Sequence, residues 1–246
     1  MSVPAPAPLD ARLRFEPHVV DAWTVRLDQP AAVRTMYEET LASDERDRAR
    51  RFVFERDRDH YVVCRGALRQ LLSAYLGMAP AAVAFAYGHR GKPSLEGFAT
   101  PPEFNVSHAD GVAVIAVTAG SPIGVDIESV SRAVEFEALA RRFFSAREAE
   151  ELLSLPSAAR QAAFFACWTR KEAYIKAIGD GLACPLDSFA VTLRPGEEPT
   201  FRWIATDDAA KWTLRAFEPA SGFLAAVASR APIAHVTCRN FQGPLS

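Results

Sequence analysis

The feature that most constrains the fold is an order of elements that occurs twice in the chain. Each copy has a long helical stretch, a glycine that ends it, a proline a few residues later and a short apolar strand. The landmarks are Gly77, Pro80 and Phe85 in the first copy and Gly179, Pro185 and Phe189 in the second. The copies lie roughly 105 residues apart, which is too long for a solenoid repeat. We therefore expect an α+β fold built as a pseudo-twofold pair of similar halves, with the ligand cleft between them.

Apolar periodicity and turn residues predict where these halves lie. Proline and alanine alternate near the start of the chain, which predicts a flexible N-terminal arm over residues 1–19. An N-terminal α+β half follows over 20–119 and a C-terminal half over 120–246. Helices are expected at 31–41, 60–76, 145–153 and 158–178, and residues 130–144 are expected to be a linker. The third helix begins at a capping box of Ser145 and Glu148.

Composition excludes several classes of protein. The 246 residues carry a formal net charge of −2, so no global positive field attracts nucleic acid or an anionic membrane. No apolar run approaches the ~20 residues of a membrane span, and the first residues lack the basic and apolar regions of a signal peptide. The four cysteines have neither zinc-site nor redox-motif spacing. We expect a cytoplasmic protein with reduced thiols, in which local patches carry any anion binding.

Two charged segments of the first half have open interpretations. Residues 44–59 are dense in charges of both signs, which by itself favours a solvated helical face with ion pairs. The alternative is that some of its arginines face inward and bind phosphate. The segment G-H-R-G-K-P-S-L, residues 88–95, is a turn-rich loop whose glycines allow close backbone approach to a ligand, and its Lys92 adds charge.

The stretch W-T-R-K-E-A-Y-I-K-A-I-G-D-G, residues 168–181, ends the longest predicted helix. Trp168, Glu172 and Lys176 are spaced four apart and share one helix face, with Lys171 on its flank. A helix that only packs would carry leucine or alanine there. An aromatic ring, a carboxylate and ammonium groups together favour a polyanion held by lysines and a divalent cation held by the carboxylate.

The segment G-V-D-I-E-S, residues 124–129, has the pattern of a strand that carries two acids on one face. Asp126 and Glu128 point the same way because side chains alternate along a strand. Two such carboxylates repel each other unless they are protonated or bridged by a cation, and Mg²⁺ prefers oxygen ligands of this kind. The alternative for the pattern alone is a solvent-facing strand end, since short matches are common by accident. Glu172 would supply a third carboxylate.

The segment F-N-V-S-H-A-D, residues 104–110, places Ser107 and His108 after a short strand. A lone histidine is more often a structural hydrogen-bonding group than a ligand. A nucleophilic serine–histidine pair is disfavoured, because neighbouring strand residues point to opposite faces and no G-x-S-x-G turn is present.

Taken together, these segments resemble the 4′-phosphopantetheinyl transferases of the surfactin type. The resemblance covers about residues 48–191 and rests on five motifs in chain order: G-K-P-S-L, F-N-V-S-H, G-V-D-I-E-S, R-R-F-F-S-A-R-E and W-T-R-K-E-A-Y-I-K. It implies Mg²⁺-dependent transfer of 4′-phosphopantetheine from coenzyme A to a serine of an apo acyl or peptidyl carrier protein, with release of adenosine 3′,5′-bisphosphate. Such enzymes activate fatty-acid, polyketide or nonribosomal peptide synthesis. The resemblance also implies that coenzyme A lies between two pseudo-symmetric halves.

The resemblance implies a role for each matching residue. The Mg²⁺ ligands would be Asp126, Glu128 and Glu172, and the catalytic residues Glu172, Lys176 and Asp126. Glu172 is the first candidate to accept the proton of the carrier serine. The coenzyme A contacts would be Arg48 at the 3′-phosphate, Lys92 and Pro93 beside the adenine with Ser107 nearby, His108 and Lys176 at phosphate oxygens, Lys171 beside them, and Asp126 and Glu172 through the metal.

The sequence departs from the family pattern where the 3′-phosphate would bind. Glu45 stands at a position that is basic in the family, and Tyr61 replaces a small hydroxyl residue. Arg56 and His60 are candidates to compensate. The linker 130–144 and the helix that begins at Ser145 are expected to face the carrier protein.

Two other function classes fit parts of the pattern. A Mg²⁺-dependent phosphohydrolase or nuclease would also use three carboxylates and lysines, but a nuclease would carry a basic groove, which the pI of about 6.2 disfavours. A non-catalytic module that binds coenzyme A or a carrier protein would be expected to have lost a metal ligand or a lysine, and none is lost here. We expect a monomer, because one chain contributes both walls of the cleft.

Overall fold

The computed structural model describes residues 13–179 and 184–243. The first half contains β1 (Val19–Arg26), α1 (Ala31–Thr40), α2 (Ser43–Arg50), α3 (Glu55–Leu76), β2 (Phe85–Tyr87), β3 (Pro93–Leu95), β4 (Glu103–Ala109) and β5 (Val112–Thr118). The rest of the chain forms β6 (Ile123–Ser129), α4 (Phe136–Phe143), α5 (Ala146–Ser154), α6 (Ser157–Ile178), β7 (Phe189–Val191), β8 (Phe201–Ile204), β9 (Thr213–Phe217), β10 (Phe223–Ser229) and β11 (His235–Phe241).

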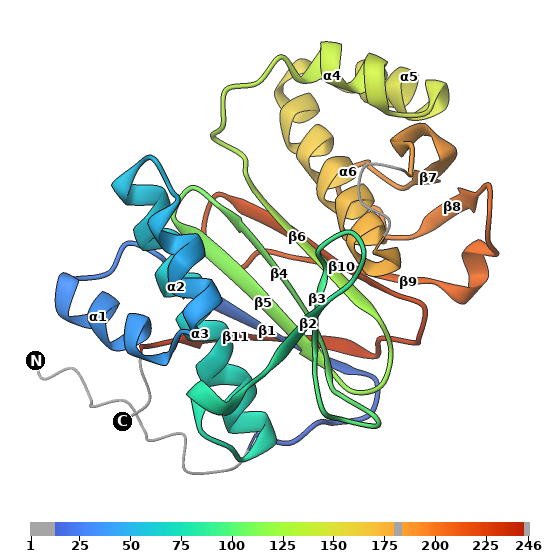
Figure 1. Cartoon of the computed structure of the whole chain (residues 1–246). Helices are drawn as coiled ribbons and strands as arrows, with labels where there is room; N and C mark the ends of the chain where they lie inside the picture. The colour runs from blue at the N-terminus through green and yellow to red at the C-terminus, as the bar shows by residue number, and fades with distance from the viewer. Residues whose placement is uncertain (1–12, 180–183, 244–246) are drawn as a thin grey trace, which may run out of the picture.

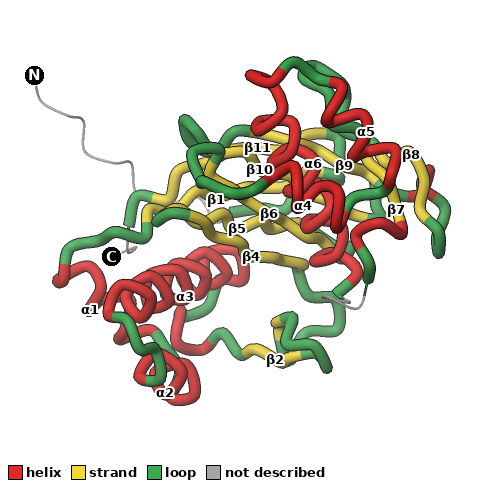
Figure 2. The backbone as a smooth tube through the Cα atoms, turned by 90° about the horizontal axis from the view of Figure 1, so that it is seen from above, coloured by secondary structure: helices red, strands yellow, loops and turns green. Residues whose placement is uncertain are grey.

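These elements stack as helices, sheet, sheet and helices (Figure 1). Helices α1–α3 cover the outer face of the first sheet, and α6 covers the outer face of the second, with α4 and α5 packed against α6 (Figure 2). The two sheets meet through a shared apolar layer contributed by β1, β5, β6 and β10. The fold is therefore α+β, as the sequence predicts.

The internal repeat is visible in the sheet topology. The first sheet contains the strand order β1-β5-β4 beside the hairpin β2-β3, and the second half repeats it as β6-β10-β9 beside the hairpin β7-β8. Both long helices, α3 and α6, have 22 residues and end at a glycine in the left-handed conformation, Gly77 and Gly179. Glycine is favoured there because positive φ is costly for other residues. The two predicted halves thus have the same order of elements.

Strand periodicity explains why the central strands are apolar throughout. Every residue of β5 is buried. Its even-numbered residues from 112 to 116 face the other sheet, and its odd-numbered residues from 113 to 117 face α3. Alternation along a strand produces this division, and a strand covered on both faces needs apolar residues at nearly every position. Each large side chain buried in this way contributes about 1.5–3 kcal/mol to folding.

Three expectations from the sequence need correction. The segment 130–144 is not only a linker, because it contains α4, whose apolar residues at 136, 139, 140 and 143 have helical spacing. The predicted arm is packed in its last part, since Phe15 stacks on Tyr75 with ring centroids 4.7 Å apart. Its residues 1–12 lie outside the described part of the chain. Strand β11 was not predicted, and it pairs with β1 in the first sheet rather than with the second.

No helix within residues 13–179 and 184–243 combines the length and the apolar character that crossing a membrane requires.

Candidate functional site

A polar cluster forms where α6 lies closest to β6. A side chain at Gly124 would place its Cβ 2.0 Å from the carbonyl oxygen of Ala173, so only glycine permits this approach. The contact brings Lys176 of α6 over Asp126 of β6, with Nζ 2.6 Å from Oδ1. Ser107 of β4 completes the cluster, because its hydroxyl donates to Asp126 Oδ1 at 2.9 Å and accepts from Lys176 at 2.8 Å.

The carboxylates of this cluster are only partly compensated by nearby cations. Asp126 Oδ2 is buried and has no hydrogen-bond partner in the described structure. Burial, and secondarily the charge of Asp126, raises the pKa of both Glu128 and Glu172. Arg132 partly offsets this at Glu128, with Nη1 3.2 Å from Oε2. A bound cation would stabilise the ionised form of these three carboxylates, because one oxygen of Asp126 has no partner and the two glutamates have raised pKa values.

The donor set fits a hard divalent ion. Among residues 13–179 and 184–243, no three His, Cys, Asp or Glu side chains converge closely enough to enclose a metal ion. Mg²⁺ does not require such an enclosure, because it commonly binds one or two carboxylates and completes its shell with water and substrate phosphates. The orphaned oxygen of Asp126 is the free ligand that this kind of site needs.

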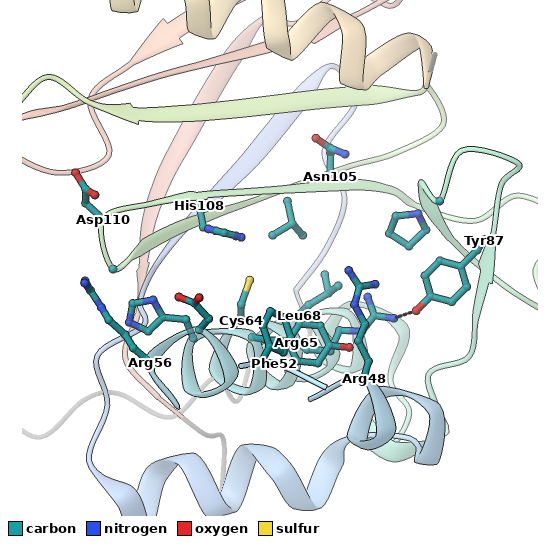
Figure 3. Close-up of a pocket in the computed structure, with 17 residues that line it drawn as sticks. Arg48, Phe52, Arg56, Cys64, Arg65, Leu68, Tyr87, Asn105, His108 and Asp110 are labelled. Atoms are coloured by element: carbon teal, nitrogen blue, oxygen red, sulfur yellow. Dashed lines mark hydrogen bonds between the residues drawn. The ribbon is translucent and has the colours of Figure 1, made fainter. Parts of the chain in front are cut away.

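A cavity of about 760 Å³ lies beside the cluster, between α3 and β4. Figure 3 shows side chains of α3 below it and those of β4 above it. All of its lining residues lie between positions 48 and 111, in the first half of the chain. Three arginines, Arg48, Arg56 and Arg65, outnumber the two acids, Asp57 and Asp110, so the lining carries a net positive charge, and His60 and His108 add polar ring nitrogens. The cavity therefore suits an anionic ligand.

Two adjacent residues of β4 connect the cavity with the cluster. His108 lines the cavity, whereas Ser107 points the other way to Asp126, as alternation along a strand requires. Burial, then the positive charge of Lys176, lowers the pKa of His108. Asn105, on the same strand, accepts a hydrogen bond from the backbone of Val125 at 2.8 Å and fixes β4 beside β6. The cavity of the first half thus adjoins the acids of the second.

The first departure from the family pattern, Glu45, is explained by the two arginines that surround it in the interior. It is 2% exposed and pairs with Arg65 and with Arg69, whose Nε lies 2.6 Å from Oε2. Burial favours its neutral form, but these arginines outweigh burial and the pKa of Glu45 is lowered. The pairing places the Arg65 guanidinium 3.9 Å from the centroid of the Phe85 ring, where it donates to the Tyr87 hydroxyl at 2.6 Å (Figure 3). Glu45 therefore orients a cavity arginine from the interior.

The second departure, Tyr61, lies in the cavity wall. The guanidinium carbon of Arg48 lies 5.4 Å from the centroid of its ring, within the range of a cation–π contact. Arg56 and His60, the proposed compensating residues, both line the cavity, and Pro93 lines it too. His60 is also paired with Asp28, with Nε2 2.8 Å from Oδ1. The structure thus brings Arg48, Pro93 and His108 together in one cavity.

Lys171 does not lie in the site, and its predicted contact with coenzyme A is wrong. Its side chain is 0% exposed, and Nζ lies 2.8 Å from Glu148 Oε2. Nζ also donates to the carbonyls of Leu186 at 2.8 Å and Phe189 at 2.6 Å. Glu148, which forms the predicted capping box with Ser145, thus also receives a buried ammonium. The physical reason is that Lys171 and Glu172 are neighbours on a helix and point in different directions.

Lys92 also differs from the expectation. Its ammonium donates to the carbonyls of Ile123 at 3.0 Å and Ala177 at 3.1 Å, away from the cavity that Pro93 lines. Trp168, which the sequence groups with the polar face of the helix, packs against the core of the second half, with its ring centroid 5.6 Å from that of Phe164. Phe144 is 4% exposed and belongs to the same core.

Sequence reasoning missed several cavity residues, among them Arg65, Tyr87 and Asn105. A partial signal existed for Arg65: it follows Tyr61 by four positions, so the two share the α3 face that Arg48 contacts. The signal for Tyr87 and Asn105 is tertiary, because β2 and β4 reach the cavity only through the fold.

Comparison with known proteins accounts for both halves. The family described as the 4′-phosphopantetheinyl transferase superfamily matches residues 122–228. The family described as 4′-phosphopantetheinyl transferase, N-terminal, matches residues 29–120. The chain is 41% identical over 211 residues to 4′-phosphopantetheinyl transferase HetI of Nostoc sp., covering 85% of this chain and 86% of that protein.

Two more distant similarities are to a second transferase sequence and to a solved structure. The chain is 29% identical to 4′-phosphopantetheinyl transferase Sfp of Bacillus subtilis, covering 78% of this chain and 83% of that protein. Among solved structures, the holo-[acyl-carrier-protein] synthase of Thermotoga maritima aligns with a TM-score of 0.35 and 21% identity over 44% of this chain and 61% of that one. The chain belongs to the 4′-phosphopantetheinyl transferase superfamily and transfers the 4′-phosphopantetheine group from coenzyme A to carrier proteins.

Proposed function

We propose that this transfer depends on Mg²⁺ bound first by Asp126, with Glu128 and Glu172 as further ligands whose side chains would move toward the ion. The observation that carries the proposal is the buried Oδ2 of Asp126, which has no partner in the described structure beside two acids with raised pKa values. Glu128 would have to exchange its contact with Arg132 for the ion. When bound, Mg²⁺ would neutralise charge on the pyrophosphate of coenzyme A.

The cationic cavity would hold the nucleotide end of coenzyme A. Arg48 is assigned to the 3′-phosphate, Pro93 to the border of the adenine, and His108 to a phosphate oxygen, because all three line the same cavity. Lys176 would contact the phosphates next to the polar cluster, and Ser107 would hold Lys176 and Asp126 in place. Lys171 and Lys92 have no role in this binding.

In the reaction, the serine oxygen of the carrier protein bonds to the β-phosphorus while the bond from that phosphorus to its bridging oxygen breaks. Adenosine 3′,5′-bisphosphate leaves, and the serine proton must be accepted. We assign that proton to Glu172, directly or through a water, because it is the carboxylate that α6 brings to the proposed metal site, beside the reacting phosphate. Lys176 would stabilise the charge that develops on the phosphate oxygens.

The carrier protein is proposed to dock on α4 and α5, which lie on the outer side of α6 (Figure 1). We further propose that the enzyme acts as a monomer, since one chain supplies both the cavity and the acidic cluster. A cytoplasmic location stays a prediction from the sequence.

The test of the metal is the intact mass of an apo carrier protein after incubation with this protein, coenzyme A and Mg²⁺. We expect a gain of one phosphopantetheine group, which EDTA abolishes and excess Mg²⁺ restores. A gain that persists in EDTA would contradict the metal assignment but leave the transfer intact. No gain on carriers from fatty-acid, polyketide and peptide synthesis would favour a binding module or a hydrolase of coenzyme A.

The test of the nucleotide site is Arg48→Met. Removing a charge-assisted contact to a phosphate costs about 1.5–3 kcal/mol, so KM for coenzyme A should rise about 10- to 100-fold. KM for 3′-dephospho-coenzyme A should not change, because that substrate lacks the phosphate. Arg50→Met is the matched control, since Arg50 lies on the same helix with a side chain 73% exposed and does not line the cavity. An equal rise in KM for both substrates would place Arg48 elsewhere on the ligand.

A further inference from the structure

Lys92 connects the two halves of the molecule. It directly precedes β3 in the first half, yet its ammonium donates to Ala177 of α6 at 3.1 Å and to Ile123 of β6 at 3.0 Å. Lys92 is half-buried, and its Cδ lies 3.6 Å from the position that a Cβ at Gly179 would occupy. One side chain of the first half thus contacts two elements of the second, α6 and β6.

The two carbonyls that Lys92 binds flank the acidic cluster. Ala177 directly follows Lys176, and Ile123 precedes Asp126 by three residues on the same strand. Gly124, the residue after Ile123, lies so close to the backbone of α6 that there is no room for a side chain. The Lys92 ammonium therefore binds α6 and β6 close to Lys176 and Asp126, the two residues whose contact joins these elements.

The electrostatics of this position favour the contact. Ala177 is in the last turn of α6, where carbonyls have no partner within the helix. A cation at a helix C-terminus also interacts favourably with the helix dipole. Burial lowers the pKa of Lys92, and the nearby Glu103 opposes that shift. Pro93, the next residue and the first of β3, lines the nucleotide cavity, whereas the Lys92 ammonium is bound by carbonyls of α6 and β6.

We infer that Lys92 is a positioning residue for the transfer reaction: it fixes α6 on β6 so that Lys176 and Asp126 keep their contact. It acts on the rate of transfer and not on the affinity for coenzyme A. The inference rests on the proposed roles of Lys176 and Asp126.

The test is Lys92→Met, which keeps the length of the side chain and removes its donors. Displacing catalytic groups by a fraction of an ångström to an ångström should lower kcat by on the order of 10- to 100-fold. The Kd of coenzyme A, measured by calorimetry without carrier protein, should stay within about twofold of that of the unmodified enzyme. Amide hydrogen exchange should rise in peptides from α6 and β6 and not in those from α3.

Two further variants make the result decisive. Lys92→Gln keeps an amide NH2 group as donor on a shorter side chain. Its kcat should lie between those of the unmodified enzyme and Lys92→Met. This variant replaces Lys92→Met in the test if the methionine variant does not fold. Lys211→Met removes an exposed lysine of the second half and should change nothing.

Two outcomes would overturn the inference. A tenfold or larger loss of coenzyme A affinity with kcat unchanged at saturation would make Lys92 a ligand contact. Unchanged kcat and unchanged hydrogen exchange would remove any positioning role. Neither outcome bears on the metal assignment, which the EDTA experiment tests separately.

Discussion

The Glu172→Gln variant should lose about 100- to 10,000-fold in kcat, the range that a positioned general base contributes. Glutamine keeps the size of the side chain but can neither accept the serine proton nor supply a charged ligand. The affinity for coenzyme A should remain measurable, because the cationic cavity is lined by other residues. The measurement is the single-turnover rate of carrier-protein modification, followed by mass, beside the Kd of coenzyme A.

Glu38→Gln is the control for this experiment. Glu38 is an exposed acid on α1, remote in the fold from the acidic cluster (Figure 1), so the same chemical change there should leave the rate unaltered. Full activity of Glu172→Gln would remove Glu172 from the mechanism and shift the role of base to Asp126 or to a water.

The Lys171→Met variant should be strongly destabilised without a direct effect on the chemistry. The substitution leaves the carboxylate of Glu148, 1% exposed, without its cation. Breaking one side of a buried ion pair costs about 3–5 kcal/mol, because an uncompensated charge stays in the interior. The measurement is the free energy of unfolding from urea denaturation.

The double variant Lys171→Met/Glu148→Gln tests whether the unpaired charge of Glu148 is the cause of the lost stability. Glutamine removes the unpaired charge and can still accept the backbone N–H of Val191, which lies 2.9 Å from Glu148 Oε1. It should therefore recover part of the lost stability. A Lys171→Met protein of normal stability that binds coenzyme A at least tenfold more weakly would instead restore the lysine to the ligand site.

The comparison of Lys171 with Glu172 shows what the sequence can and cannot determine. Both residues belong to the same motif, and a helix turns about 100° per residue, so the two cannot face the same neighbour. Periodicity assigned Trp168, Glu172 and Lys176 to one face, and the structure places Lys176 on Asp126. The destination of Lys171 depends on Glu148, which was assigned only a capping role because its second contact is tertiary.

The fold was predictable where the rule is local. The capping box at Ser145, the glycine that ends each long helix and the alternation along β4 and β6 are present as the residues indicate. The helix at 136–143 had the right periodicity but is short. The role of Glu45 could not be predicted, because one acid in a segment dense in charges of both signs gives no indication that its partners, Arg65 and Arg69, lie on another helix.

The parallel pairing of β11 with β1 bears on how the chain is made. Val19 pairs with His235, so one edge of the first sheet stays open until the ribosome has released residues 235–241. A nascent chain that has completed only the first half presents an unpaired strand edge, to which other chains can add. Contacts between residues so distant in sequence also form slowly. The β1 edge is therefore the part of the first sheet that is completed last during synthesis.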